Sequence, residues 1–104
     1  MKVPGASGGP APLNLTALRT DGSTVHLNWD PPPCPPYPIV WYDVTRSVNG
    51  GDFLYIGGSD SPTFFDDTNA PSGSQYSYIV YAFYDEGSGD PQGSDPSNTA
   101  TVGP

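Results

Sequence analysis

The sequence predicts an all-β chain, a seven-stranded antiparallel Greek-key β-sandwich. Side chains alternate with a period of two along most of the chain, and no helical period of 3.6 residues accompanies them. Gly and Pro signals separate the alternating runs at short spacing, while 7 Tyr, 4 Phe and 2 Trp supply apolar surface for a core. Short alternating runs punctuated in this way are typical of two packed sheets.

The first half of the chain contains four of the expected strands. Leu13–Arg19 ends at the turn signal Asp21-Gly22, and the run VHLNWD then alternates buried and exposed side chains. Val40–Ser47 alternates in the same manner and ends at the tight turn Asn49-Gly50-Gly51. A short strand, Asp52–Ile56, is expected to end at the following pair of glycines.

The second half contains the other three strands. Thr63–Asp66 is a short candidate closed by a turn region, and Tyr76–Tyr84 has the clearest alternation in the chain. A long loop, Asp85–Asp95, is expected before a last strand, Asn98–Val102. We therefore expect a Gly/Pro-rich arm at 1–11, flexible or docked on a partner, one domain at 12–102, and a tail at 103–104.

The order of these signals resembles a fibronectin type III domain, an immunoglobulin-like β-sandwich, over about residues 11–102. The resemblance is carried by these motifs: Pro12-x-x-Leu15, Val25-x-Leu27-x-Trp29-x-x-Pro32, Ile39-x-x-Tyr42-x-Val44, Ser74-Gln75-Tyr76-x-Tyr78-x-Val80-x-Ala82, and Ser97. It implies a core that includes Trp29, Tyr42, Val44, Tyr76, Tyr78 and Val80. It also implies that the Tyr76 hydroxyl ties back to the preceding turn.

Prolines crowd the segment DPPPCPPYPI around the single cysteine, Cys34. Consecutive prolines fix φ near −65° and favour an extended polyproline path. We expect this segment to be a stiff loop between the second and third strands, with a partner-facing loop as the alternative. Cys34 has no basic neighbour to activate its thiol, so we expect it to be inert.

The charge balance limits the partners of the chain. With 3 basic residues against 11 acidic ones and a net charge of −8, neither nucleic acid nor an anionic membrane is an expected partner. No run of apolar residues approaches the length of a membrane span.

Catalytic and metal-binding patterns are sparse. His26 is predicted to face solvent without a nucleophile nearby, and Cys and His are too few to hold zinc. Asp66-Asp67 and the acidic loop Asp85–Asp95 offer oxygen ligands to calcium but match no defined calcium loop. We therefore expect no enzyme activity, no metal and no cofactor.

Large apolar side chains remain for the outer face of one sheet. If the core side chains point inward, four neighbours on the third and sixth strands point outward, and two residues of the fourth strand extend the patch. The predicted binding surface is Trp41, Ile79, Tyr81, Phe83, Phe53 and Tyr55. The alternative is that residues 1–11 or the long loop cover these side chains.

Two functions are consistent with this surface. The first is a structural module that assembles with other protein subunits, including copies of itself, as a capsid decoration or tail appendage of a bacteriophage virion. Its motivation is a reading frame that looks complete at 104 residues without a secretion signal. The second is a spacer or carbohydrate-engaging accessory module of a secreted bacterial glycoside hydrolase, located outside the cell, in which aromatic rings stack on sugars.

Overall fold

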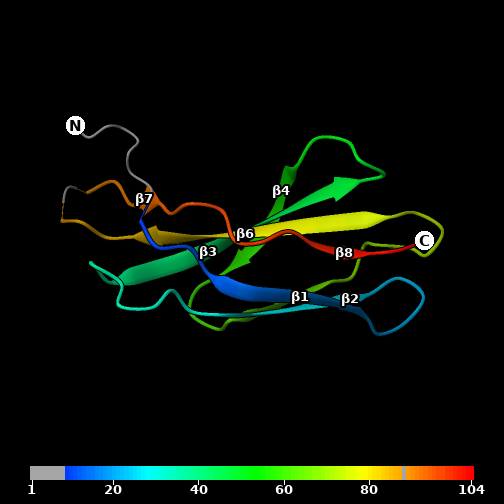
Figure 1. Ribbon diagram of the computed structural model, residues 1–104, viewed down its shortest axis with the longest axis horizontal. Coiled ribbons are helices and arrows are strands. Elements are labelled where there is room, and N and C mark those ends of the chain that lie inside the picture. Colours follow the sequence, from blue (N-terminus) through cyan, green and yellow to red (C-terminus); the bar gives the residue numbers. More distant parts are fainter. Residues whose placement is uncertain (1–8, 88) are drawn as a thin grey trace.

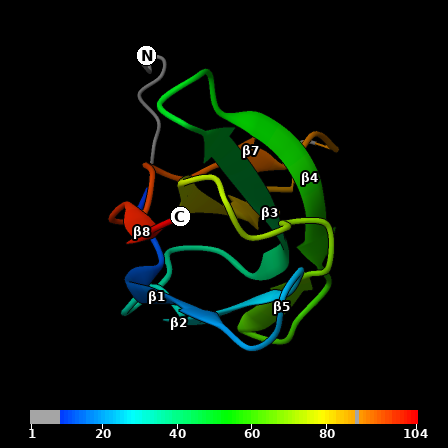
Figure 2. The ribbon, with the colours of Figure 1, turned by 90° about the vertical axis from the view of Figure 1, so that its right-hand side faces the viewer.

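The computed structural model describes residues 9–87 and 89–104, and these form two antiparallel sheets packed face to face (Figures 1 and 2). The prediction of an all-β sandwich is confirmed. The smaller sheet has three strands in the order β1-β2-β5. Its strands are β1 (Leu13–Arg19), β2 (Val25–Asp30) and β5 (Phe64–Asp67).

The larger sheet has five strands and carries most of the aromatic side chains. Its order is β4-β3-β6-β7, with β8 also pairing with β6. Its strands are β3 (Ile39–Val48), β4 (Leu54–Ser59), β6 (Tyr76–Tyr84), β7 (Gln92–Gly93) and β8 (Ala100–Val102). The long pairing of β3 with β6 forms its centre, and β4 is a free edge.

The structure has one short strand more than the sequence predicts, and the last predicted strand is shorter than expected. β7 lies within the predicted loop Asp85–Asp95, and β8 begins at Ala100 rather than at Asn98. Between them, Ser94 and Ser97 each accept a backbone N–H of β6 on the side-chain oxygen and donate their own N–H to a β6 carbonyl. Side-chain hydroxyls thus replace a regular ladder beside Pro96, which has no N–H to give.

The boundaries of β4 also differ from the prediction. The strand runs to Ser59, through the two glycines that were expected to end it. Tyr55 pairs with Thr45 and Gly57 pairs with Val44, so β4 has one residue more than β3 at this point. The extra residue forms a β-bulge, which shifts the register of the two strands. Gly57 has a φ of 149° and lies against a ring of the other sheet, and a Cβ there would be 2.9 Å from Phe65 Cζ.

The core lies between the sheets and consists of their inward-facing side chains. The Trp29 and Tyr42 rings meet edge to face with centroids 5.3 Å apart, which joins β2 to β3. The observed β3 and β5 each differ from the predicted strand by one residue at each end. All six side chains expected in the core are buried: Trp29, Tyr42, Val44, Tyr76, Tyr78 and Val80.

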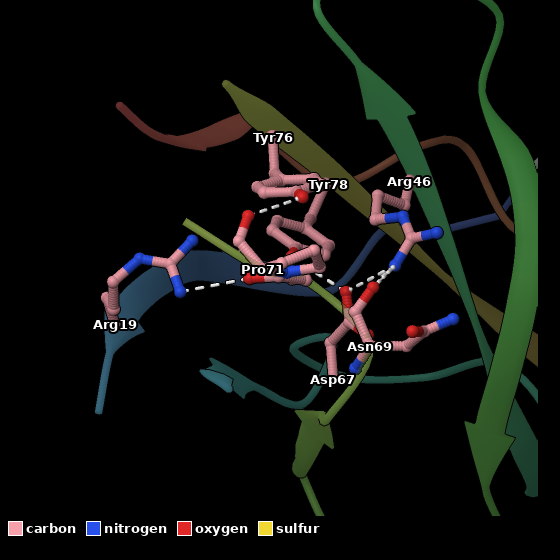
Figure 3. Close-up of polar contacts among 8 residues, drawn as sticks. Arg19, Arg46, Asp67, Asn69, Pro71, Tyr76 and Tyr78 are labelled. Atoms are coloured by element: carbon pink, nitrogen blue, oxygen red, sulfur yellow. Dashed lines mark hydrogen bonds and ion pairs between the residues drawn. The ribbon is translucent and has the colours of Figure 1, made fainter. Parts of the chain in front are cut away.

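The turn before β6 is fixed by the tyrosine that the family resemblance singled out (Figure 3). The Tyr76 hydroxyl donates a 2.7 Å hydrogen bond to the carbonyl oxygen of Pro71. Ala70 beside it is fully buried, and its carbonyl oxygen accepts a 2.9 Å hydrogen bond from the Arg19 guanidinium. Arg19, the last residue of β1, therefore holds this turn through its hydrogen bond to Ala70.

The proline-rich segment connects β2 to β3, as expected, over residues 31–38. Pro32 is buried while Tyr37 is 44% exposed. Cys34 is exposed and has a φ of 46°, in the left-handed region that non-glycine residues seldom adopt. The loop thus anchors one proline in the sandwich and presents the rest to solvent.

Candidate functional site

The structure places the predicted surface on the outer face of the larger sheet. Trp41 pairs with Phe83 across β3 and β6, and their rings stack 5.2 Å apart at 18°. Tyr81 lies opposite Asp43, and Ile79 lies opposite Thr45, on the same face. All four predicted residues of β3 and β6 are partly buried, so their neighbours cover part of each side chain.

Tyr55 brings β4 into the same surface, whereas Phe53 lies just before that strand. Tyr55 is 65% exposed and Phe53 is 41% exposed. A groove of about 560 Å³ opens between Tyr55 and the stacked pair of Trp41 and Phe83. We call this hollow the aromatic groove; its lining residues are Trp41, Tyr42, Asp43, Tyr55, Gly58, Ser59, Asp60 and Phe83.

The structure therefore brings three of the six predicted surface residues together around the groove. Ile79, Tyr81 and Phe53 are not among its lining residues. Sequence reasoning did not single out Asp43, Gly58 or Asp60. Asp43 alternates in step with Trp41 on β3, which is the signal that could have found it.

Gly58 lines the groove at a point where the backbones of β3 and β4 are very close. It pairs with Asp43 across β3 and β4, and a Cβ there would lie 2.3 Å from the carbonyl oxygen of Tyr42. A side chain is thus excluded where β4 passes Asp43. The Asp43 carboxyl group consequently has Gly58 on one side and Tyr81 on the other.

Burial raises the pKa of the Asp43 carboxyl group, and a hydrogen bond with the Trp41 side chain opposes part of that rise. The carboxylate has therefore lost some of its hydration in the folded chain. Asp60 adds a second acidic side chain to the lining and is exposed. The groove accordingly combines aromatic ring surface with negative charge.

Segments next to β6 cover one side of the stacked pair. Gly93 of β7 lies beside Phe83, and a Cβ there would be 3.2 Å from the Phe83 ring. At the other face of β6, the Tyr84 hydroxyl donates to the carbonyl oxygen of Pro10, which fixes the start of the described chain. The expectation that residues 1–11 cover the patch falls mostly on 1–8, outside the described residues.

The only histidine lies on the other sheet. His26 Nδ1 is 2.6 Å from Asp66 Oδ1, and the His26 ring stacks on Phe64 with centroids 6.1 Å apart. Both members of this ion pair are exposed to solvent. Across 9–87 and 89–104, no group of three or more His, Cys, Asp or Glu side chains is arranged to hold a metal ion. No helix in that part of the chain is long and apolar enough to span a membrane.

The sequence matches the fibronectin type III domain family over residues 10–100. The chain belongs to this family. Its two sheets, its buried Trp29 and the hydrogen bond from Tyr76 to Pro71 agree with that assignment. The resemblance stated from the sequence motifs is thereby confirmed.

Solved structures of fibronectin type III domains share the fold. A fibronectin type III-like protein from Clostridium thermocellum is 28% identical with a TM-score of 0.72, over 91% of this chain and 92% of that one. A pectate lyase from Pectobacterium carotovorum is 27% identical with a TM-score of 0.65, over 86% of this chain and 26% of that one.

Titin kinase with its flanking domains shares the fold alone, at 19% identity and a TM-score of 0.77 over 93% of this chain. This fibronectin type III domain spans 17% of that titin chain. No curated protein matches the sequence. Fibronectin type III domains are generally non-catalytic modules. The solved structures contain them both as short chains and as parts of long ones.

Proposed function

We propose that this fibronectin type III domain is a non-catalytic binding module that docks onto another protein through the aromatic groove. The observation that carries the proposal is the position of Trp41, Tyr55 and Phe83 around one hollow on the outer face of the larger sheet. Aromatic side chains are enriched at protein interfaces, where a few of them supply most of the binding energy.

The exposure of Tyr55 supports a partner contact. At 65% exposed, its ring is largely uncovered although it stands beside two stacked rings. A partner that covers Tyr55 gains apolar contact without moving Trp41 or Phe83, which hold each other in place. A preformed site of this kind binds with little loss of side-chain entropy.

A second candidate is an accessory module of a polysaccharide-acting enzyme outside the cell. The similarity to part of a pectate lyase chain, at 27% identity, favours it. Exposed aromatic rings stack on sugar rings as readily as on protein groups. Two acidic side chains in the groove disfavour an anionic polysaccharide, so this candidate applies to neutral chains.

The narrower prediction of a bacteriophage decoration or tail protein, located in the virion, stays a prediction. Mass spectrometry of purified virus particles would test it directly, because a structural component is present in the particle at fixed stoichiometry.

A display library of random peptides tests the leading proposal. Peptides selected on the wild-type domain are expected to lose binding to Trp41→Ala/Phe83→Ala and to Tyr55→Ala. They are expected to bind normally to Leu18→Ala/Phe64→Ala, a matched control at exposed apolar side chains of the other sheet. Tyr55→Ala is included because an exposed ring is removed without opening the core.

Either of two results would count against protein docking. Selected peptides that bind every variant equally would place the contact elsewhere. Pull-down by an insoluble neutral polysaccharide, lost on Trp41→Ala, with no groove-dependent peptides, would favour the second candidate. Sedimentation of the wild type over a concentration series would show whether the protein partner is a second copy.

A further inference from the structure

The charge of the aromatic groove points to the chemistry of its ligand. Two carboxylates, Asp43 and Asp60, line it, and no Lys, Arg or His is among the lining residues. We infer that the groove accepts an arginine side chain of a partner protein, held by the Asp43 carboxylate and the aromatic rings. This inference rests on the proposed docking function and names the partner group that it recognises.

A cation fits both components of the groove. The faces of Trp, Tyr and Phe rings attract cations through their quadrupoles, most strongly where water is excluded. A carboxylate next to those rings adds a charge-assisted hydrogen bond. Asp43 is partly desolvated, as the rise of its pKa on burial indicates, so an incoming cation restores electrostatic stabilisation that folding removed.

Arginine fits the groove better than lysine. Its guanidinium is planar and weakly hydrated, it stacks on aromatic faces, and it binds a carboxylate through two parallel N–H groups. Lysine carries a compact ammonium that keeps its hydration more strongly. Asp43 and Gly58 both line the groove, and Gly58, the residue of β4 that pairs with Asp43, has no side chain to obstruct a flat group that approaches the carboxylate.

The two arginines of this chain are already engaged within it. Arg46 pairs with Asp67 at 2.9 Å, and Arg19 donates to the carbonyl oxygens of Asp21 and Ala70. With 3 basic residues and a net charge of −8, the domain attracts basic partners over long range. Charge complementarity therefore assigns the arginine to a different, basic protein rather than to a second copy of the domain.

The test uses two capped tripeptides, Gly-Arg-Gly and Gly-citrulline-Gly, titrated against the ¹⁵N-labelled domain. Citrulline has the shape of arginine but no charge. Shifts are expected at the Trp41 indole and at the backbone amides of Gly58 and Asp60. Loss of the charge is expected to weaken binding by about tenfold, the effect of one charge-assisted hydrogen bond.

Two variants separate a local contact from general attraction. Asp43→Asn is expected to weaken binding of the arginine tripeptide to the domain by about tenfold. Asp21→Asn removes the same charge from an exposed turn of the other sheet and is expected to change binding by less than about twofold. Equal losses in both variants, or equal binding of both tripeptides, would overturn the inference.

The result also distinguishes this inference from the docking proposal. Peptides from the display library that need Trp41 and Tyr55 but contain no arginine would refute the arginine ligand and leave protein docking intact. An absence of any groove-dependent peptide, together with no arginine-induced shifts at the groove, would refute both. The docking proposal and the arginine ligand are both supported if the arginine tripeptide shifts the resonances of the groove residues and Asp43→Asn abolishes those shifts.

Discussion

Arg46 of β3 and Asp67 of β5 form an ion pair that links the two sheets, with Nη1 2.9 Å from Oδ2 (Figure 3). The Asp67 side chain is 5% exposed and also accepts a 2.8 Å hydrogen bond from the Tyr78 hydroxyl. Burial and the neighbouring Asp67 carboxylate both raise the pKa of Tyr78, so its hydroxyl stays protonated as the donor. One carboxylate thereby joins β3, β5 and β6.

Removal of this carboxylate is expected to destabilise the domain strongly. Asp67→Ala leaves the Arg46 side chain, which is 18% exposed, without its ion-pair partner, and a change of this type costs about 3–5 kcal/mol. Urea unfolding measures the loss. The control is Asp66→Ala, which breaks the exposed pair with His26 and is expected to cost less than about 1 kcal/mol. Similar losses for both variants would contradict the prediction.

The Tyr76 hydroxyl is expected to stabilise the turn before β6. Tyr76→Phe keeps the ring but removes the hydrogen bond to Pro71, at a cost of about 1 kcal/mol. Tyr55→Phe is the matched control, because its ring is 65% exposed and no change beyond about 0.5 kcal/mol is expected. Thermal unfolding compares the two, and an unaltered melting temperature for Tyr76→Phe would refute the role of the hydroxyl.

Gly58 is expected to tolerate no side chain. In Gly58→Ala the new Cβ meets the Tyr42 carbonyl oxygen at 2.3 Å, so β4 must move away from β3. We expect a loss of about 2 kcal/mol or more and lower amide-exchange protection in β4. Gly22→Ala, where nothing lies within 4 Å, controls for glycine replacement in general. Full protection of β4 in Gly58→Ala would contradict the close approach.

Asp43 is expected to reduce stability at neutral pH. Because its folded pKa lies above the unfolded value of about 3.9, the folded state binds the proton more tightly. The free energy of unfolding therefore falls as pH rises from the unfolded pKa through the folded one. Asp43→Asn removes that decrease. As the pH rises from about 3 to 7, the melting temperature of Asp43→Asn is expected to rise above that of the wild type. A variant that is less stable than the wild type at neutral pH would show that the Asp43 carboxylate does not destabilise the domain.

The fold was predictable because its signals are local. Alternation along Tyr76–Tyr84 set which side chains face the core, and Asp21-Gly22 and Asn49-Gly50 marked turns. The errors lie where local rules compete with pairing. Glycines in β4 predicted an end, but β3 pairs with them and a bulge absorbs the misfit. Between β7 and β8, serine hydroxyls accept backbone N–H groups of β6, and no alternation predicts that pairing.

The candidate site was predictable only in part. Outward alternation found Trp41, Tyr81 and Phe83, because strand geometry alone sends them to one face. It could not show that Phe83 stacks on Trp41, or that Tyr55 reaches the same hollow while Phe53 does not. These relations depend on register between strands, which one displaced residue in β4 changes.

By itself the sequence determined the strands, the buried face of each sheet and the family, since side-chain period and turn residues act over a few neighbouring positions. Only the tertiary structure decided that Asp67 meets Arg46 between the sheets, and that Asp43 lies opposite Gly58 in a groove. Those contacts join residues far apart in the chain. Their positions follow from the pairing of β3 with β4 and the packing of the two sheets, to which no local pattern refers.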